Sequence, residues 1–385
     1  MDPLLTVARA VCQRAKTYDD LPPLRPGDQW LRILDRFHRC AFESCNTAAE
    51  IIAFATENNG FVIYRRLDNP LTPSIIDSYM RWLEHQGAPL HSFGPTIQEN
   101  SFAGNAVVTL REGRRISTSF LWHLCAATRL IRHVGRARRV LEIGPGFGGL
   151  ARLLKLLWPD ATFCLVDLPE SLIFAYVYLS LAFPTARIVF ADSPDAVAAA
   201  EEYDFLLVPT AFLESLAGRQ FDLAINIASL GEMTQAAVDR YMQFLQSDLT
   251  VDFLYSINQF GHFSPERTAG TGRRLEGNDL CREALRLDRH WQLREWDLHG
   301  ENGFVQIDPL MAPMLEVLLR RWPAAMQDNA DDRIAGDLMA AAAGRVDRDG
   351  SWHRMMWEAA RLDSSGAAAA AYRAAAADLG WPEFR

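Results

Sequence analysis

Short apolar runs alternate with helical patterns between residue 138 and about residue 310. Within each run the residues are apolar at successive positions, which is typical of parallel strands covered on both faces. Six runs follow this pattern, and a later pair separated by HGENG suits an antiparallel hairpin at one edge: RVLEI, TFCLV, RIVFA, FLLVP, FDLAINI and VDFLYSI, then WQLREWDL and FVQID. The pattern predicts a doubly wound α/β domain, which we assign to residues 136–322.

The segments on either side of this domain follow other patterns. Residues 1–135 lack the regular alternation and are interrupted by LPPLRPG and GAPLHSFGP, although apolar spacing predicts helices over 28–41 and 72–85. From residue 323 the chain is rich in alanine, the strongest helix former, and we predict two or three helices there. We therefore expect a mostly helical N-terminal region that covers the substrate pocket, and an alanine-rich helical tail over 323–385.

Four glycines, at positions 144, 146, 148 and 149, lie between the apolar run RVLEI and a helical repeat of leucines that starts at Leu150. They occupy a turn from a strand into a helix, where the missing side chains let a ligand approach and free backbone N–H groups point toward it. Dinucleotide-binding proteins and methyltransferases both use such a turn. The glycines alone therefore predict a nucleotide-like ligand without identifying it.

Two acidic residues distinguish these ligands. Glu142 stands two residues before Gly144, where a carboxylate repels a pyrophosphate but suits a ligand that carries an ammonium and a sulfonium group. Asp167 follows the next apolar run, where a carboxylate accepts hydrogen bonds from both ribose hydroxyls. Asp167 fits either kind of cofactor, whereas Glu142 fits only the cationic one. The sequence therefore favours S-adenosylmethionine over a nicotinamide dinucleotide.

The adenine of this cofactor is expected near the end of the third strand of the sheet, where two segments are candidates. Asp192 could hydrogen-bond the exocyclic amine. The alternative is Pro209 to Ala211, which we favour because the distance to FDLAINI then matches one helix, and Asp192 is in that case the N-cap of the helix DAVAAAEE. The residues predicted to bind the cofactor are Glu142, Gly144, Gly146, Gly148, Asp167, Leu168, Thr210 and Asn226.

With these residues the chain resembles the class I S-adenosylmethionine-dependent methyltransferases, and more narrowly the bacterial sugar O-methyltransferase family. The resemblance covers about residues 138–310 and rests on VLEIGPGFGGLARLL, on VDLPESL, and on FDLAINIASLGEM with LYSIN after it. A weaker likeness extends to Glu99, Gly104, Asn105 and Ser117, and Pro145 stands where relatives often carry glycine. The resemblance implies a Rossmann-like methyltransferase sheet and transfer of a methyl group to a hydroxyl of a sugar or glycosylated small molecule.

The catalytic residues are expected after the fourth and fifth parallel strands, because ligands of open α/β sheets bind beyond the carboxyl ends of the strands. Glu232 in SLGEM and His262 in NQFGHF occupy these positions. A histidine titrates close to neutral pH without tuning, whereas a glutamate needs burial to raise its pKa. Each also has an ordinary explanation, as a loop histidine and as an acid at a helix N-terminus.

Four further polar residues are predicted to contact the sugar: Glu99, Asn105, Ser229 and Asn258. Asparagine and serine also commonly form local hydrogen bonds in turns, and that alternative stays open for Ser229 and Asn258. The sequence contains no HExxH motif and no CxxC pair among its six cysteines, so we expect neither a zinc site nor a disulfide framework and assign no metal ligands, while metal dependence stays open.

The charge balance and the lack of a long apolar segment limit the partners. A formal net charge of −9 and a pI near 5.5 argue against nucleic acid, and we interpret the eight arginines between 111 and 139 as part of a solvated helix face. The N-terminus does not resemble a secretory signal, and the most apolar helix candidate, Ser171 to Phe183, is too short to span a bilayer. We expect a cytoplasmic protein with a small-molecule acceptor, and a homo-oligomer stays open.

The leading hypothesis is therefore an O-methyltransferase. The alternative is a catalytically silent cofactor-binding or scaffolding protein with the methyltransferase fold, in which the helical tail binds a partner. A nicotinamide-dependent dehydrogenase comes third, because Glu142 argues against it.

Overall fold

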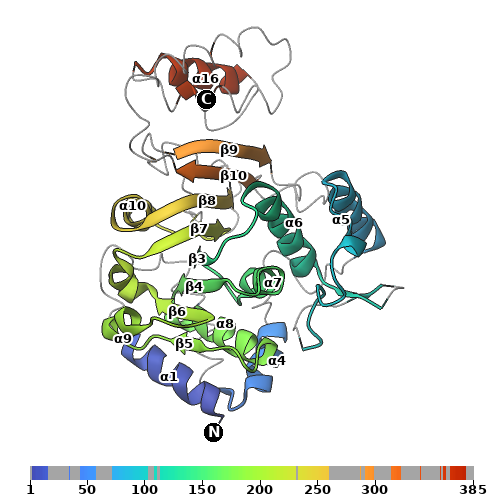
Figure 1. The fold of residues 1–385 in the computed structure, drawn as a ribbon, viewed down its shortest axis with the longest axis vertical. Coiled ribbons are helices and arrows are strands. Elements are labelled where there is room, and N and C mark those ends of the chain that lie inside the picture. Colours follow the sequence, from blue (N-terminus) through green and yellow to red (C-terminus); the bar gives the residue numbers. More distant parts are fainter. Residues whose placement is uncertain are drawn as a thin grey trace, which may run out of the picture. The chain divides into compact units, whose positions relative to one another are not determined.

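The computed structural model of the chain describes residues 2–15, 34, 44–57, 72–102, 108–110, 113–230, 233–259, 287, 291–298, 314–321, 339, 356, 359–360 and 365–378. Contacts divide the chain into two compact units, Met1–Asp222 and Leu223–Arg385, each of which is described in turn (Figure 1).

The described elements of the first unit are α1 (Pro3–Ala15), α4 (Ala48–Glu57), α5 (Pro73–His85), η3 (Leu90–Ser92), β1 (Val108–Thr109), β2 (Arg115–Ile116), α6 (Thr118–His133), β3 (Arg139–Ile143), α7 (Gly149–Leu157), β4 (Thr162–Asp167), α8 (Pro169–Ala182), β5 (Ile188–Phe190), α9 (Pro194–Ala199), β6 (Phe205–Pro209) and η4 (Thr210–Leu216). The unit boundary falls within β7 (Gln220–Ile227). The second unit continues with α10 (Gln235–Gln243), η6 (Phe244–Asp248), β8 (Thr250–Gln259), β9 (Trp291–Leu298), β10 (Met314–Arg321) and α16 (Ala367–Asp378).

The first unit contains a two-stranded sheet, β1-β2, and four parallel strands in the order β5-β6-β4-β3. In the register of β3 with β4, Ile143 lies opposite Val166, and in that of β4 with β6, Asp167 lies opposite Pro209. Most residues of β3, β4 and β6 are buried, which agrees with their continuous apolar runs, whereas the edge strand β5 is only partly buried. The carboxyl ends of β3, β4 and β6 are thus level with one another, and the predicted α/β fold class is confirmed.

The helices of the first unit pack in two groups. Helix α7 packs against α6, while α1 and α4 pack against α8 (Figure 1). Every residue of α8 from Pro169 to Leu179 is buried, including the polar residues Glu170 and Ser171. A helix that is buried all round has to be covered on all sides, and α1 and α4 of the N-terminal region pack against it.

The second unit contains an antiparallel arrangement in the order β8-β10-β9. Strand β9 matches the predicted run WQLREWDL. Its partner β10, over Met314–Arg321, was not predicted, because Leu315, Leu318 and Leu319 have the i, i+3, i+4 spacing of a helix. The run FVQID at 304–308, which we predicted as the second strand of the hairpin, lies outside the described residues.

The predictions for the flanking segments have separate outcomes. The helix over 72–85 is confirmed as α5, and α16 confirms one helix of the alanine-rich tail, whereas all of 28–41 except Leu34 lies outside the described residues. The division of the chain into 1–135, 136–322 and 323–385 stays a prediction. Among the described helices, none combines the length and apolarity needed to cross a membrane.

The interpretation of the arginine-rich segment as a solvated face holds for only some of its members. Arg132 of α6 is exposed, as are Arg136, Arg138 and Arg139. Arg129 on α6 is only 6% exposed, and its guanidinium lies 5.3 Å from the centre of the Trp82 ring. Arg114 donates to the backbone oxygens of Leu90 and Phe93, at 2.7 and 3.1 Å. The planar guanidinium stacks on rings and donates several hydrogen bonds at once, so Arg129 and Arg114 connect segments of the N-terminal region.

Candidate functional site

The glycine loop, residues 144–149, connects β3 to α7 in the predicted strand-to-helix turn. Gly144, Gly146 and Gly148 have φ angles of 72°, 55° and 82°, a left-handed conformation that costs other residues free energy. The loop is held by hydrogen bonds from Gly144 N to Val166 O at 2.8 Å and from Gly148 N to Pro145 O at 2.9 Å. The three predicted glycines are therefore required by the backbone itself.

Two glycines of this loop differ in what surrounds them. A Cβ placed on Gly146 meets no atom within 4 Å, so that side of the loop is open to a ligand. A Cβ on Gly149 comes within 2.5 Å of the Phe147 ring and 2.6 Å of the His123 ring. The loop is thus open at Gly146 and closely packed at Gly149.

This difference gives a prediction about two alanine variants. Gly149→Ala is expected to destabilise the fold by about 1–3 kcal/mol, because two buried rings must move. Gly146→Ala is expected to cost about 1 kcal/mol through its positive φ, yet to impair cofactor binding more, because the new methyl group occupies the open side. Urea denaturation and calorimetric titration with S-adenosylmethionine measure the two effects. If Gly146→Ala and Gly149→Ala lost the same stability and bound S-adenosylmethionine equally well, this assignment of the open and packed sides would be wrong.

Glu142 lies on β3, two residues before the glycine loop, and is 4% exposed. Its Oε2 atom is buried and has no hydrogen-bond partner among the described residues. Burial, and then the negative charge of Asp167, raise the pKa of this carboxyl to about 8. A buried carboxylate without a partner is unfavourable, and a positively charged ligand group beside it would remove much of that cost.

Asp167 ends β4 and is the second acid of the site. Its Oδ1 accepts a hydrogen bond from Leu168 N at 2.7 Å, and Thr210 donates its hydroxyl to the Asp167 backbone oxygen at 3.0 Å. Burial raises the pKa of the Asp167 carboxyl well above its ordinary range, although backbone hydrogen bonds from Leu168 and Gly146 lower it. The predicted cofactor residues Glu142, Asp167, Leu168 and Thr210 thus all lie at the carboxyl ends of β3, β4 and β6.

The cap predicted for Asp192 was wrong. Ser193 is the N-cap of α9, and its hydroxyl accepts a hydrogen bond from Ala196 N at 3.2 Å. Asp192 instead forms an ion pair with Arg14 of α1. Serine and aspartate cap helices equally well, and the sequence offered both at neighbouring positions, so only the backbone conformation could decide between them.

Three predicted residues of the second unit form one hydrogen-bonded network. Asn258 donates to Asn226 Oδ1 at 2.8 Å, and Asn226 donates to the Ser229 hydroxyl. Asn226 and Asn258 are 0% and 1% exposed. Ala228, which lies between Asn226 and Ser229 in the sequence, has a φ of 58°, a strained conformation for a residue other than glycine. Its N–H donates to Ile257 O at 2.7 Å. The network fixes the chain where β7 ends, and the roles predicted for these residues stay predictions.

The remaining predicted site residues fall into two groups. Asn105, Glu232 and His262 lie outside the described residues. Glu99 is 2% exposed, and its carboxylate accepts hydrogen bonds from the Ser117 hydroxyl at 2.6 Å and from Asn100 N at 2.9 Å. The predicted contact of Glu99 with substrate stays a prediction, although internal donors already reach both of its oxygens.

Sequence reasoning missed several polar side chains beside the glycine loop. His123, Arg152 and Tyr178 are all buried, and they lie on α6, α7 and α8. Burial, and then the positive charge of Arg152, lower the pKa of His123 to about 3, so the imidazole is neutral. Each of the three is a polar residue in the buried stripe of its helix, and that position was the signal available to find it.

Cysteine chemistry and metal binding have little support in the part of the chain that the structure describes. Cys45, Cys125 and Cys164 are buried, and burial raises the pKa of the Cys164 thiol to about 12. Within the same part of the chain, no three histidine, cysteine, aspartate or glutamate residues are grouped as metal ligands are. Cys164 is buried as expected for a small apolar residue of a strand.

Comparison with known proteins gives structural likeness only. Neither the protein-family models nor the curated protein sequences give a match. The pyocyanin biosynthetic protein PhzM aligns over 51% of this chain and 57% of its own, with 14% identity and a TM-score of 0.32. The magnesium protoporphyrin IX methyltransferase ChlM of Synechocystis PCC 6803 aligns over 71% of this chain and 100% of its own, with 12% identity and a TM-score of 0.37. The 1,6-didemethyltoxoflavin-N1-methyltransferase of Burkholderia thailandensis aligns over 52% of this chain and 79% of its own, with 17% identity and a TM-score of 0.34.

These overlaps do not define a function. The chain spans 57% of the length of PhzM, and all three TM-scores are below 0.5. Scores in this range carry no information on substrate or activity, so the function has to be inferred from the residues of the site.

Proposed function

We propose that this protein is an S-adenosylmethionine-dependent methyltransferase. The observation that carries the proposal is the buried Glu142 carboxyl group beside the glycine loop, whose Oε2 has no partner among the described residues. A pyrophosphate would oppose ionisation of this group further, whereas the ammonium and sulfonium of S-adenosylmethionine would favour its ionised form and pair with it. Asp167 ends the neighbouring strand, and we assign to its carboxylate the hydrogen bonds from the two ribose hydroxyls.

The contacts of the first unit suit this cofactor in two further respects. Gly146 leaves space for close approach, since a Cβ there meets nothing within 4 Å. Thr210, the first residue of η4, donates to the Asp167 backbone oxygen and so holds the backbone that carries the proposed ribose-binding carboxylate. Such fixed donors and acceptors need no rearrangement when the ligand binds, which favours affinity.

The reaction that we propose is transfer of a methyl group to a hydroxyl of a sugar or glycosylated small molecule. When bound, S-adenosylmethionine supplies a methyl group on a sulfonium, which is already a good leaving group. The protein has to align the acceptor hydroxyl, exclude water and accept one proton. We assign the proton-accepting role to Glu232 or His262. The choice of a sugar rests on the resemblance of VLEIGPGFGGLARLL, VDLPESL and FDLAINIASLGEM to sugar O-methyltransferases.

Two measurements on the full chain test the proposal. Calorimetry should detect binding of S-adenosylmethionine and no comparable binding of NAD. Incubation with methyl-labelled S-adenosylmethionine and a mixture of nucleotide sugars and glycosides should then transfer the label to a hydroxyl. Glu232→Gln and His262→Ala should retain cofactor binding, and the variant that loses turnover identifies the base.

Each failure has a distinct meaning. Preferential binding of NAD would overturn the cofactor assignment, because it would show that Glu142 does not exclude a pyrophosphate. Transfer only to an amine or a carboxylate would rule out the sugar hydroxyl while keeping the methyltransferase. Cofactor binding without turnover on any acceptor would favour the catalytically silent protein.

A further inference from the structure

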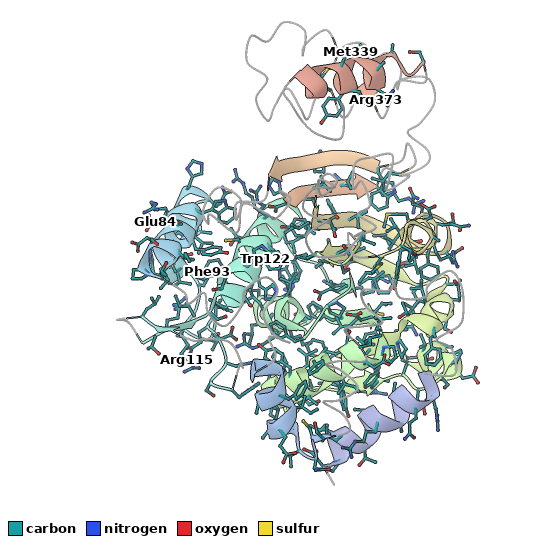
Figure 2. All side chains as sticks on the ribbon, turned by 180° about the vertical axis from the view of Figure 1, so that it is seen from behind. Glu84, Phe93, Arg115, Trp122, Met339 and Arg373 are labelled. Atoms are coloured by element: carbon teal, nitrogen blue, oxygen red, sulfur yellow. The ribbon has the colours of Figure 1, made fainter. Side chains whose placement is uncertain are left out.

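A buried polar cluster connects the N-terminal region to the glycine loop, and Glu99 is at its centre. Both carboxylate oxygens of Glu99 accept hydrogen bonds, one from the Ser117 hydroxyl and the other from Asn100 N. The Glu99 backbone is also fixed, because its N–H donates to Arg115 O at 2.9 Å and its oxygen accepts from Arg115 Nε at 3.0 Å. Figure 2 labels Arg115, which belongs to β2. The carboxylate is thus held from several sides at 2% exposure.

Tyr178 on α8 links this carboxylate to the loop. Its hydroxyl lies 3.4 Å from Glu99 Oε1 and donates to it, and burial followed by the negative charge of Glu99 raises the pKa of Tyr178, which keeps the hydroxyl protonated. The Tyr178 ring packs edge-on against Phe147, with ring centres 5.0 Å apart and an interplanar angle of 90°. Phe147 is the residue between Gly146 and Gly148. Tyr178 therefore contacts both Glu99 and the aromatic residue of the glycine loop.

A second contact joins the same two parts of the molecule. Helix α7 follows the glycine loop directly, and its residue Arg152 donates to the backbone oxygen of Gln98 at 2.8 Å. Arg152 is 6% exposed. The segment 97–100 is consequently attached both to α7 and, through Tyr178, to α8.

The glycine loop needs such support because of its composition. Glycine has the largest conformational freedom of any residue, and in the sequence Gly-Pro-Gly-Phe-Gly-Gly the only large side chain is that of Phe147. Fixing Phe147 between buried neighbours selects one loop conformation before the ligand arrives. A loop that is ordered in advance loses less entropy on binding, so the ligand binds more tightly.

We infer that Glu99 and Tyr178 are positioning residues that hold the glycine loop in its ligand-binding conformation, so that residues 97–100 of the N-terminal region, together with Ser117, control cofactor affinity. This inference rests on the proposed function. It is an alternative to the predicted role of Glu99 in contacting the sugar, because the carboxylate accepts hydrogen bonds from Ser117, Asn100 and Tyr178 within the protein.

Tyr178→Phe is the variant that tests the inference most cleanly, because it removes the hydroxyl and leaves the ring on Phe147. Tyr176→Phe is the matched control, since Tyr176 is also buried on α8 but packs against Phe190, away from the loop. Glu99→Gln and the double variant, which combines Tyr178→Phe with Glu99→Gln, complete a double-mutant cycle. The probes are S-adenosylmethionine and S-adenosylhomocysteine in calorimetry, and amide hydrogen exchange of the peptide that contains residues 144–149.

Tyr178→Phe and Glu99→Gln are each expected to weaken cofactor binding about fivefold, at a temperature where circular dichroism shows both variants folded. The double variant should be no weaker than the worse single variant, because the two residues act along one path. Hydrogen exchange of the loop should become faster in Tyr178→Phe and stay unchanged in Tyr176→Phe. A purely structural role would lower the melting temperature without changing loop exchange or affinity.

The outcomes separate this inference from the proposed function. If the wild-type chain binds neither probe, the proposed function fails, and hydrogen exchange alone decides whether the cluster orders the loop. If the wild type binds and Tyr178→Phe changes neither affinity nor loop exchange, the inference is overturned while the proposed function stands. Should Glu99→Gln fail to fold, the comparison of Tyr178→Phe with Tyr176→Phe still decides.

Discussion

Asp167→Ala is expected to weaken binding of S-adenosylmethionine by about a hundredfold or more, while the domain remains folded. The carboxylate is assigned two charge-assisted hydrogen bonds to ribose hydroxyls, and such bonds contribute about 1.5–3 kcal/mol each. Burial raises the pKa of Asp167, so the ionised carboxylate is unfavourable in the free protein, and its removal should cost little stability. Calorimetric titration with S-adenosylmethionine measures the affinity.

Two companion variants make this result specific. Asp167→Asn retains one acceptor and should give an intermediate affinity. Asp160→Ala is the control, because Asp160 forms an exposed ion pair with Arg136 and its side chain is 79% exposed. Wild-type affinity in Asp167→Ala would show that the carboxylate does not bind the ribose.

The cofactor half of the candidate site was predictable because its residues follow one another along the chain. Glu142, the glycines and Asp167 lie within a strand, a turn, a helix and a second strand, and two parallel neighbours bring their carboxyl ends together automatically. The local pattern of apolar residues and glycines is therefore enough to predict that these residues lie close together.

The supporting residues were not predictable for the opposite reason. Glu99 and Tyr178 are 79 residues apart, and nothing in the sequence near either one indicates the other. The left-handed conformation of Ala228 was also hidden, because alanine gives no sign of a positive φ. Strand β10 was missed because its leucines have helical spacing, and only its pairing with β8 and β9 makes it a strand. In each case tertiary contacts decide what local sequence leaves open.

Glu142→Gln is expected to change stability and cofactor affinity in opposite directions. The pKa of Glu142 is about 8 in the folded protein, against an ordinary value of 4.5, so the folded state retains a proton that the unfolded chain releases between these values. The stability of the free protein should therefore fall as the pH rises from about 4.5 to about 8. Glutamine does not titrate, so the variant should be more stable than the wild type at about pH 8.5.

The same substitution removes the negative charge that the cofactor is proposed to meet. A ligand cation beside Glu142 lowers the pKa of the carboxyl, so binding to the wild type should release protons and become tighter as the pH rises through about 8. In Glu142→Gln the affinity should be about tenfold lower, and its dependence on pH should be weaker but not absent, because Asp167 has a raised pKa as well.

Melting temperatures between about pH 5 and pH 8.5, with and without S-adenosylmethionine, measure both effects in one experiment. Glu201→Gln, at an exposed position, is the control and should match the wild type in each condition. A variant whose melting temperature and affinity follow the wild type at every pH would show that the Glu142 carboxylate has no role in selecting a cationic ligand. A variant that is more stable without the ligand and binds it less well would mean that the protein keeps an unfavourable buried charge because the cofactor needs it.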